Sequence, residues 1–585
     1  MRKMSRALVL VLPLIVLAVW FYSTWSGPRI KDGSVLTLDL RGRYVEDQAS
    51  PLLARLTGRG EVPLVAVLSR LSTAERDPRL YAVVLRVGDL DIGWGKAQEL
   101  RGAIQRLREA GRRPVAYLEV ESFAANLEYY VASAAERVVM APGARGAVVG
   151  LAGEYFFLGG VWQKLGVEIE IERAGAYKSA VDFFTGRRMS EAYREMANWL
   201  LDSIEEQFVA DIAESRELST EQVRAAIRGA PVAAEGLRAL KLIDEVAYHR
   251  EVVTSLGEHP LVKEEDYARV SPRSVGFDPV AHVALIYGSG TVVTGEGGHS
   301  PSGRSVFAAD SVSRALEEAA EDEDIDAIVL RIDSPGGSAM ASDLLWGAVQ
   351  HARGKKPVVA SFSDVAASGG YYVASAADAI VALPGSVTGS IGAFVLRPVI
   401  SGLLDKLGIG YETLLRSPHA EIATATRKLS RGERERLRQD LEGVYALFVE
   451  RVAEGRDIPK EQVDAVGQGR VWTGAQAAEH GLVDSLGGLR AAVAEVRKAL
   501  ELPEEADVAL LPYPPPASLA EQLAELLQGT ASALGMHRSS SLRAVAALGM
   551  HRLLLPAELE EFFAWLLPPA GDRPVLLPPI AVRIR

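Results

Sequence analysis

The chain has 585 residues, of which 48% are hydrophobic and 24% charged, and its formal net charge is −12. This length indicates roughly two to four folded domains, and the composition excludes wholesale disorder. The modest negative charge, with no basic cluster, argues against nucleic acid as a partner. Because there is no cysteine, thiol catalysis, disulfides and cysteine zinc sites are excluded. The nine histidines form no HExxH pair, so we expect neither a metal nor a cofactor.

The chain opens with a basic segment and then an apolar one. Three basic residues lie within residues 1–6, and residues 7–25 carry no charge. As a helix, residues 7–25 would be about 28 Å long, close to the thickness of a bilayer core, and aromatic residues gather at the far end. We therefore predict a cytoplasmic segment 1–6, a transmembrane anchor 7–25 and an exported remainder. A cleaved signal peptide is the alternative, although only residues 24–26 approach a cleavage motif.

The remainder contains two copies of one pattern. The heptapeptide YYVASAA occupies both 129–135 and 371–377, an offset of 242 residues. Three further pairs of anchors keep the same order: AVVLRV with AIVLRI upstream, KLG with KLG, and LKLID with HGLVD downstream. Four ordered anchors predict a duplicated domain and exclude a solenoid of many short repeats. We assign the copies to residues 27–275 and 276–500.

Each copy alternates short apolar runs with amphipathic stretches, and this pattern predicts an α/β fold with parallel strands and crossover helices. A long helical stretch should follow each sheet region, and residues 501–585 should form a Pro-rich, partly helical tail of unknown role. In the second copy we expect strands at 282–288, 327–332, 357–362 and 379–384 and helices at 311–322 and 341–352, and we expect the long helical stretches at 190–228 and 430–455.

A candidate nucleophile precedes the second YYVASAA. That copy reads DVAASGGYYVASAA, so Ser368 follows a predicted strand and precedes Gly369 and Gly370, whereas the first copy has Asn126 at the same place. The glycines permit a tight turn, and the Gly369 N–H at a helix start can face a developing oxyanion. The alternative is a serine that caps a helix, with glycines for close packing.

A second glycine motif lies upstream in RIDSPGGSA, residues 331–339. A strand that runs into Pro-Gly-Gly and then a helix presents free backbone N–H groups, so Gly336 or Gly337 can supply a second oxyanion donor. The first copy has no PGG at this place. A plain strand-to-helix turn is the alternative.

The first copy carries a lysine that the second lacks. Lys178 lies in ERAGAYKSAVDFF among apolar and small residues, and the second copy has Ala420 at the aligned position. A lysine acts as a general base only when neutral, so its pKa of about 10.4 must fall by about three units, which desolvation can supply. A solvated surface lysine is the alternative. One copy thus keeps a serine and the other a lysine, which predicts a site where the two copies meet.

These motifs together resemble the signal peptide peptidase A family in its long, two-repeat form. The resemblance covers about residues 30–500 and rests on AYKSAVDFF, RIDSPGGSA, the glycine- and serine-rich segment around Ser368 and Ser390, and VWTGAQAAEHGLVDSLGG. It implies domains of the crotonase/Clp-protease type and a Ser–Lys dyad of Ser368 and Lys178, with Ser390 bonded to the lysine.

The resemblance also implies a substrate class and an assembly. Family members cleave signal peptides left in the membrane after export, and similar apolar peptides, and they assemble into rings, with the long form tetrameric. For this chain we therefore expect a single-pass protein of the bacterial inner membrane, with its catalytic domains on the periplasmic side. Residues 501–585 exceed the family core.

Three alternatives stay open at this stage. His351 and Asp364 lie near Ser368 in the sequence and could form a histidine-based triad. The same fold also serves crotonase-like acyl-CoA enzymes, although such an enzyme needs no serine and lysine divided between copies. A non-catalytic membrane scaffold is the third reading, and it predicts random loss of site residues rather than complementary retention.

Overall fold

The computed structural model describes residues 30–46, 62–122, 124–146, 148–297, 305–417, 420–515, 575–576 and 583–584. The predicted anchor at 7–25 and most of the tail lie outside these residues. Within the described ranges, no helix has both the length and the apolar character that a membrane crossing requires.

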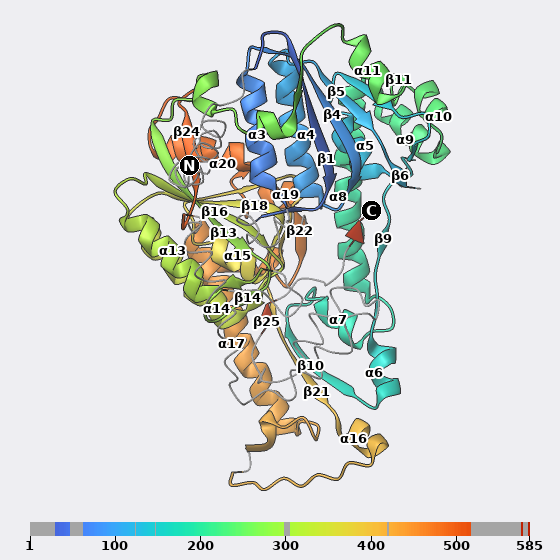
Figure 1. Ribbon diagram of the computed structural model, residues 1–585. Helices are drawn as coiled ribbons and strands as arrows, with labels where there is room; N and C mark the ends of the chain where they lie inside the picture. Colours follow the sequence, from blue (N-terminus) through green and yellow to red (C-terminus); the bar gives the residue numbers. More distant parts are fainter. Residues whose placement is uncertain are drawn as a thin grey trace, which may run out of the picture.

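A six-stranded parallel sheet forms the centre of the first copy, with the strand order β11-β7-β5-β4-β1-β12. Helices pack against the sheet, so its central strands are almost continuously apolar (Figure 1). The strands are β1 (Ser34–Gly42), β4 (Leu80–Leu90), β5 (Pro114–Leu118), β7 (Arg137–Met140), β11 (Glu245–Val246) and β12 (Leu261–Lys263). The main helices are α3 (Leu64–Arg76), α4 (Trp94–Glu109), α5 (Asn126–Ala132), α8 (Glu191–Arg216), α9 (Thr220–Gly229), α10 (Ala234–Ala239) and α11 (His249–Ser255).

The second copy repeats this arrangement on an eight-stranded sheet, with the order β22-β20-β18-β16-β13-β24 and with β19 and β23 beside β18. Four of its strands lie on the predicted apolar runs, which confirms a mixed α/β fold. The strands are β13 (Ala281–Ser289), β16 (Ala327–Ser334), β18 (Val358–Ala367), β19 (Ala379–Ala382), β20 (Val387–Gly389), β22 (Val471–Thr473), β23 (Ser485–Leu486) and β24 (Val508–Pro512). The helices are α13 (Ala309–Glu321), α14 (Ala339–Arg353), α15 (Gly369–Ala374), α16 (Ser401–Leu407), α17 (Arg431–Arg456), α18 (Lys460–Val466), α19 (Gly474–Glu479) and α20 (Leu489–Ala499).

The predicted helical stretch at 190–228 is two helices rather than one. Helix α8 ends where Glu217 takes a left-handed conformation with φ of 53°. Helix α9 begins anew at Ser219, whose hydroxyl accepts from the Gln222 N–H in a capping box. The equivalent stretch of the second copy, α17, is a 26-residue helix as expected.

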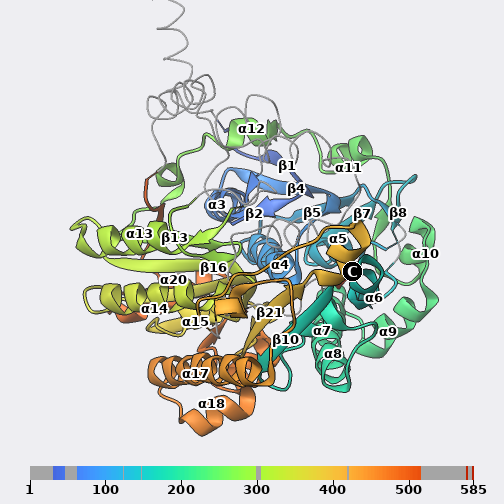
Figure 2. The ribbon, with the colours of Figure 1, turned by 90° about the horizontal axis from the view of Figure 1, so that it is seen from below.

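A third sheet joins the two copies and the tail. Its order is β10-β21-β25-β17-β14-β15, and β10 of the first copy pairs antiparallel with β21 of the second over seven residues. Figures 1 and 2 show these two strands side by side as a ribbon that leaves the body of the molecule. The strands are β10 (Glu168–Ala174), β14 (Val292–Val293), β15 (Phe307–Ala308), β17 (Gly337–Ser338), β21 (Ala393–Val399) and β25 (Val575–Leu576).

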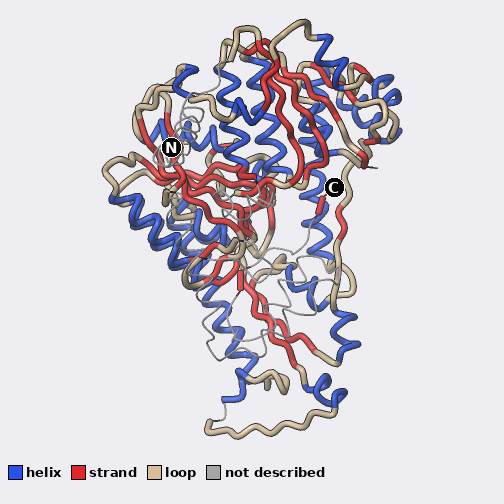
Figure 3. Tube along the Cα trace, in the orientation of Figure 1, coloured by secondary structure: helices blue, strands red, loops and turns tan. Residues whose placement is uncertain are grey.

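Short elements complete the described chain, and Figure 3 shows how all strands and helices are distributed. They are β2 (Tyr44–Val45), β3 (Val62–Pro63), β6 (Glu121–Ser122), β8 (Arg145–Gly146), β9 (Gly153–Glu154), β26 (Arg583–Ile584), α6 (Gly159–Leu165), α7 (Ala180–Thr185), α12 (Glu264–Tyr267), and the 3₁₀ turns η1 (Pro272–Val275) and η2 (Ala420–Ala423). Each copy has its own large apolar core, and smaller clusters fill the contacts between them.

Candidate active site

Ser368 lies in the turn between β18 and α15, as the sequence predicts. Its φ of 54° and ψ of −113° are strained for a residue with a side chain, at a cost on the order of 1–3 kcal/mol. The Gly389 carbonyl accepts the Ser368 N–H at 2.8 Å and holds this turn. The hydroxyl makes no helix-capping bond, which removes the alternative of a simple cap.

Lys178 comes from the first copy, in the segment between β10 and α7. Its side chain is completely buried, and its Nζ lies 2.7 Å from the Ser368 Oγ. The loop around Gln468 supports this segment, because the Gln468 carbonyl accepts the Tyr177 N–H at 2.7 Å. Gly469 allows this loop to lie against the Lys178 backbone, because a Cβ at position 469 would lie 2.5 Å from the Lys178 backbone nitrogen.

Ser390, between β20 and β21, provides the other contacts of the lysine. The Nζ lies 2.9 Å from the Ser390 Oγ and 2.8 Å from its carbonyl oxygen. A neutral amine has two donor hydrogens and one lone pair. Charged Lys178 would donate to all three oxygens, whereas neutral Lys178 would donate twice to Ser390 and accept the hydroxyl proton of Ser368, so these contacts fit either protonation state.

The electrostatic surroundings favour that neutral form. Burial holds the pKa of Lys178 well below its ordinary value of 10.5. Lys96 provides a comparison, because its side chain is also buried but lies 2.5 Å from Asp333 and 2.7 Å from Asp364, and these carboxylates raise its pKa. Burial without a neighbouring carboxylate thus favours a neutral amine at Lys178, whereas the carboxylates beside Lys96 favour its ammonium form.

The predicted oxyanion donors lie together beside Ser368. A Cβ on Gly369 would lie 3.1 Å from the Gly337 nitrogen and 3.2 Å from the Gly336 Cα, so the two glycine motifs are in contact. The Gly336 N–H already donates to the Ser334 Oγ at 3.2 Å. The geometry therefore favours Gly337, with Gly369, as the donor pair. Gly337 also pairs with Leu576 of β25, the tail strand between β17 and β21.

The histidine-based alternative finds no support in the geometry. His351 is exposed on α14, while the Ser368 oxygen is buried against Lys178. Asp364 binds the first copy instead: it accepts the backbone N–H groups of Gly93 and Lys96 and pairs with the Lys96 ammonium. Within the described residues, no cluster of side chains could hold a metal ion.

Sequence reasoning missed two charged networks that position the site. Lys96 binds Asp333, three residues before Gly336, and Asp364, four residues before Ser368. Asp333 also accepts the Val365 N–H at 3.1 Å, so the network connects the segments that contain Gly336 and Ser368 to α4 of the first copy. The aspartates stand inside the recognised motifs, but only the fold reveals the lysine between them.

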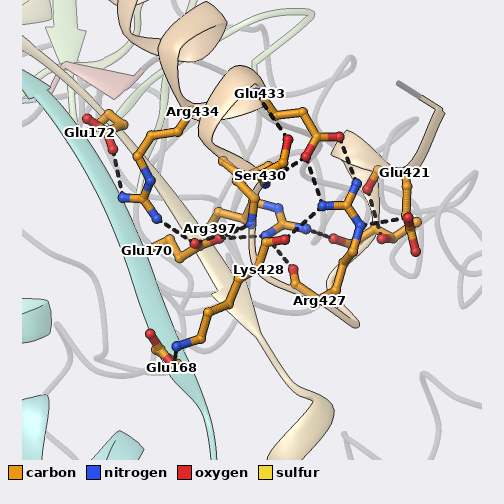
Figure 4. Close-up of polar contacts among 12 residues, drawn as sticks. Glu168, Glu170, Glu172, Arg397, Glu421, Arg427, Lys428, Ser430, Glu433 and Arg434 are labelled. Atoms are coloured by element: carbon orange, nitrogen blue, oxygen red, sulfur yellow. Dashed lines mark hydrogen bonds and ion pairs between the residues drawn. The ribbon is translucent and has the colours of Figure 1, made fainter. Parts of the chain in front are cut away.

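The second network holds the ribbon that carries Lys178. Glu170 on β10 is buried and accepts from the Arg397 guanidinium on β21 at 2.7 Å and from Arg434 on α17 at 2.7 Å (Figure 4). Arg434 also binds Glu172, and Lys428 binds Glu168. Three acidic residues of the first copy thus meet a basic surface of the second.

The chain matches Peptidase family S49 over residues 108–263 and again over residues 350–503, once in each copy. It is 34% identical to "Serine protease SPPA, chloroplastic" of Arabidopsis thaliana, over 87% of this chain and 75% of that protein. It is 29% identical to "Protease 4" of Haemophilus influenzae, over 83% of each chain.

Among solved structures, a point mutant of ClpP1 from Listeria monocytogenes aligns with 36% of this chain and 94% of its own, at 17% identity and a TM-score of 0.24. A score this low supports no inference about the fold. The sequence matches define the class of protein, a serine peptidase with a duplicated domain. The chain belongs to peptidase family S49.

Proposed function

We propose that this chain is a membrane-anchored serine endopeptidase in which Ser368 is the nucleophile, Lys178 the general base and Ser390 the residue that orients the lysine. The observation that carries the proposal is the 2.7 Å contact between the Ser368 Oγ and a buried lysine whose pKa is lowered. In the proposed site, residues 27–275 contribute the general base and residues 276–500 contribute the nucleophile.

The geometry supports acyl transfer in two stages. Neutral Lys178 takes the hydroxyl proton as the Ser368 Oγ attacks the scissile carbonyl carbon. The N–H groups of Gly369 and Gly337 stabilise the oxyanion of the tetrahedral intermediate. The lysine ammonium then gives its proton to the leaving amine, and an ester to Ser368 remains. Lys178 next deprotonates a water that attacks this ester, and the resulting ammonium returns the proton to the Ser368 Oγ as the acid product leaves.

The strand position between β17 and β21, beside the site, supports an extended peptide as substrate. Strand β25 of the tail pairs with both β17 and β21, so backbone groups next to Gly337 accept an added strand. The chain also resembles the signal peptide peptidase A family, with its crotonase/Clp-protease type of domain. This resemblance implies that the substrates are cleaved signal peptides and similar apolar peptides. The uncharged run at 7–25, behind the basic residues of segment 1–6, supports an anchor with the catalytic domains exported to the periplasmic side of the bacterial inner membrane, and the resemblance implies a homo-oligomer.

The test is hydrolysis of a synthetic signal peptide by the full-length protein in detergent, with products identified by mass spectrometry. We expect internal cleavage of the apolar segment and no hydrolysis or isomerisation of acyl-CoA thioesters. Turnover of thioesters without peptide cleavage would favour the crotonase-like alternative. Absence of both activities in folded protein would favour a non-catalytic scaffold.

A further inference from the structure

Four residues of the second copy, 467–470, lie against the segment that carries Lys178, and we call them the bridging loop. The Gln468 carbonyl of this loop accepts the Tyr177 N–H at 2.7 Å. The carbonyl of the last residue of the loop accepts the Ser390 N–H at 2.5 Å. The bridging loop therefore holds both the residue before the lysine and one of the two serines that the lysine contacts.

The side-chain amide of Gln468 connects the two copies. Its Oε1 accepts the Ala176 N–H of the first copy at 3.3 Å. Its Nε2 donates to the Asp464 carboxylate on α18 at 2.5 Å and to the Tyr445 hydroxyl on α17 at 3.2 Å. We call Tyr445 and Asp464 the supporting pair, because this hydroxyl also accepts the Gln468 N–H and donates to Asp464. An amide has one accepting and one donating end, and both ends are used here.

The bridging loop and the lysine segment are packed backbone against backbone. Gln468 has a φ of 55°, a left-handed conformation that residues with side chains seldom adopt. Across the contact, a Cβ on Gly175 would lie 2.6 Å from the Gln468 carbonyl carbon. The Arg470 guanidinium lies 4.2 Å from the centre of the Tyr177 ring and stacks on it. A shift of the loop would therefore move the backbone of the lysine segment with it.

The first copy lacks the amide that makes this connection. Helices α8 and α17 are both 26 residues long and differ by 240 positions. At this offset Arg228 corresponds to Gln468, and the counterparts of the supporting pair are Glu205 and Arg224, which form an ion pair at 2.9 Å. Both copies thus connect their two helices at this place. Only the copy that contains Ser368 adds a glutamine directed at the other copy.

We propose that Gln468 is a positioning residue: it ties the backbone before Lys178 to the supporting pair and so sets the distances from the Lys178 Nζ to its two serines. Arg470 assists through its stacking on the preceding tyrosine. The Nζ contacts uncharged oxygens of Ser368 and Ser390, so the placement of its backbone, rather than an ion pair, determines where it lies. This inference rests on the proposed function of Ser368 and Lys178.

Gln468→Gly tests the amide, because glycine tolerates a φ of 55° and keeps the carbonyl that binds Tyr177. With the backbone held less firmly, the Nζ moves away from both serines, so kcat should fall at least about tenfold with KM little changed. Only the neutral amine is a base, so activity rises with pH through the pKa of Lys178. Water that reaches the amine raises this pKa toward 10.5, so the rising limb should move to higher pH by at least about half a unit.

Tyr445→Phe is a second variant, and it leaves the contact between the copies untouched. It removes one bond of the supporting pair and should change kcat and the pH limb in the same direction but by less, because Gln468 keeps its bond to Asp464. Tyr267→Phe is the matched control, because it also removes a buried hydroxyl that donates to an aspartate, Asp77, at 3.1 Å. The control should keep kcat and the pH limb of the wild type even where its melting temperature falls.

The measurement is hydrolysis of the synthetic signal peptide by the full-length variants in detergent, from about pH 6 to about pH 10, with Ser368→Ala and Lys178→Ala in parallel. Wild-type kcat and pH limb in Gln468→Gly and Tyr445→Phe, with both parallel variants inactive, would overturn this inference alone. Equal effects in the Tyr267→Phe control would overturn it as well. If Gln468→Gly does not fold, Tyr445→Phe decides by the same criteria. An active Ser368→Ala or Lys178→Ala protein would instead overturn the proposed function.

Discussion

Ser368 and Ser390 share a backbone conformation that side chains seldom adopt. Their φ values are 54° and 56°, and both hydroxyls lie within 3 Å of the Lys178 Nζ. The surrounding bonds maintain this strain, since Ser368 N–H donates to Gly389 and Ser390 N–H donates to Arg470. Backbone strain at both serines and a buried amine between them lower the stability of the folded protein. Such features are typical of functional sites.

Ser390→Ala tests the orienting role. The lysine loses one of its two acceptors but keeps the Ser390 carbonyl, so we expect kcat to fall roughly tenfold to a hundredfold with KM little changed. Ser375→Ala is the matched control, because that buried hydroxyl donates to the Tyr372 carbonyl. A wild-type kcat for Ser390→Ala would reduce Ser390 to a packing residue.

The lowered pKa of Lys178 predicts a pH-dependent cost in stability. Between its folded pKa and its ordinary value of 10.5, the unfolded chain holds one more proton, so stability rises with pH in this window. Lys178→Met removes the buried amine and should raise the melting temperature at pH 7 by a few degrees. The difference in melting temperature between this variant and the wild type should become smaller as the pH approaches 10.

Lys96→Met is the control for that measurement. It leaves Asp333 and Asp364 without their buried partner and should lower the melting temperature at pH 7. Thermal denaturation at pH 7 and pH 10 compares the two variants. A Lys178→Met protein less stable than wild type at pH 7, or a gain that does not shrink with pH, would mean that the lysine is charged in the fold.

At the scale of elements, the strands and turns that local sequence patterns determine are the features best predicted from the sequence. The strands β13, β16, β18 and β19 follow from apolar runs, and the turn at Ser368 follows from its glycines. The pairing of β10 with β21 connects residues more than 200 positions apart, and no local pattern encodes it. Glu170 and Lys96 were missed for the same reason, since their partners lie in the other copy.

Glu170→Ala tests whether the ribbon positions the lysine. Its loss leaves the buried Arg397 without its carboxylate and should cost about 3–5 kcal/mol of stability. Because β10 leads into Lys178, kcat should fall as well. Glu168→Ala, which removes an exposed ion pair on the same strand, should cost at most about 1 kcal/mol. Denaturant unfolding and peptide hydrolysis compare them, and equal stabilities would exclude a structural role for Glu170.

At the scale of the whole molecule, the proposed site takes its serine from one copy and its lysine from the other. The comparison of YYVASAA repeats locates the complementary serine and lysine in the sequence, because each motif stands alone in its copy. The 2.7 Å distance between their side chains depends on how the two copies pack against each other. The β10–β21 ribbon and the network around Lys96 determine that packing, and no sequence pattern predicts it. The role of Ser390 was predicted from the family resemblance, because a serine that follows a glycine does not by itself indicate a particular function.

Mixed assemblies test whether each site belongs to a single chain. Full-length Ser368→Ala and Lys178→Ala proteins, co-expressed with different tags and purified through both, should remain inactive toward an apolar peptide. The serine and the lysine of one site come from the same chain, so neither variant can complete the other. Recovered activity would place the two residues of a site on neighbouring chains.

The most direct measurement of the central claim is covalent trapping by a peptidyl phosphonate with an apolar sequence, followed by mass mapping of the modified residue. In wild-type protein we expect modification of Ser368 alone. In folded Lys178→Ala protein we expect modification at least about a hundredfold slower, because the hydroxyl loses its base. Modification of another residue, or of Ser368 at the wild-type rate without Lys178, would contradict a site in which the lysine of one copy activates the serine of the other.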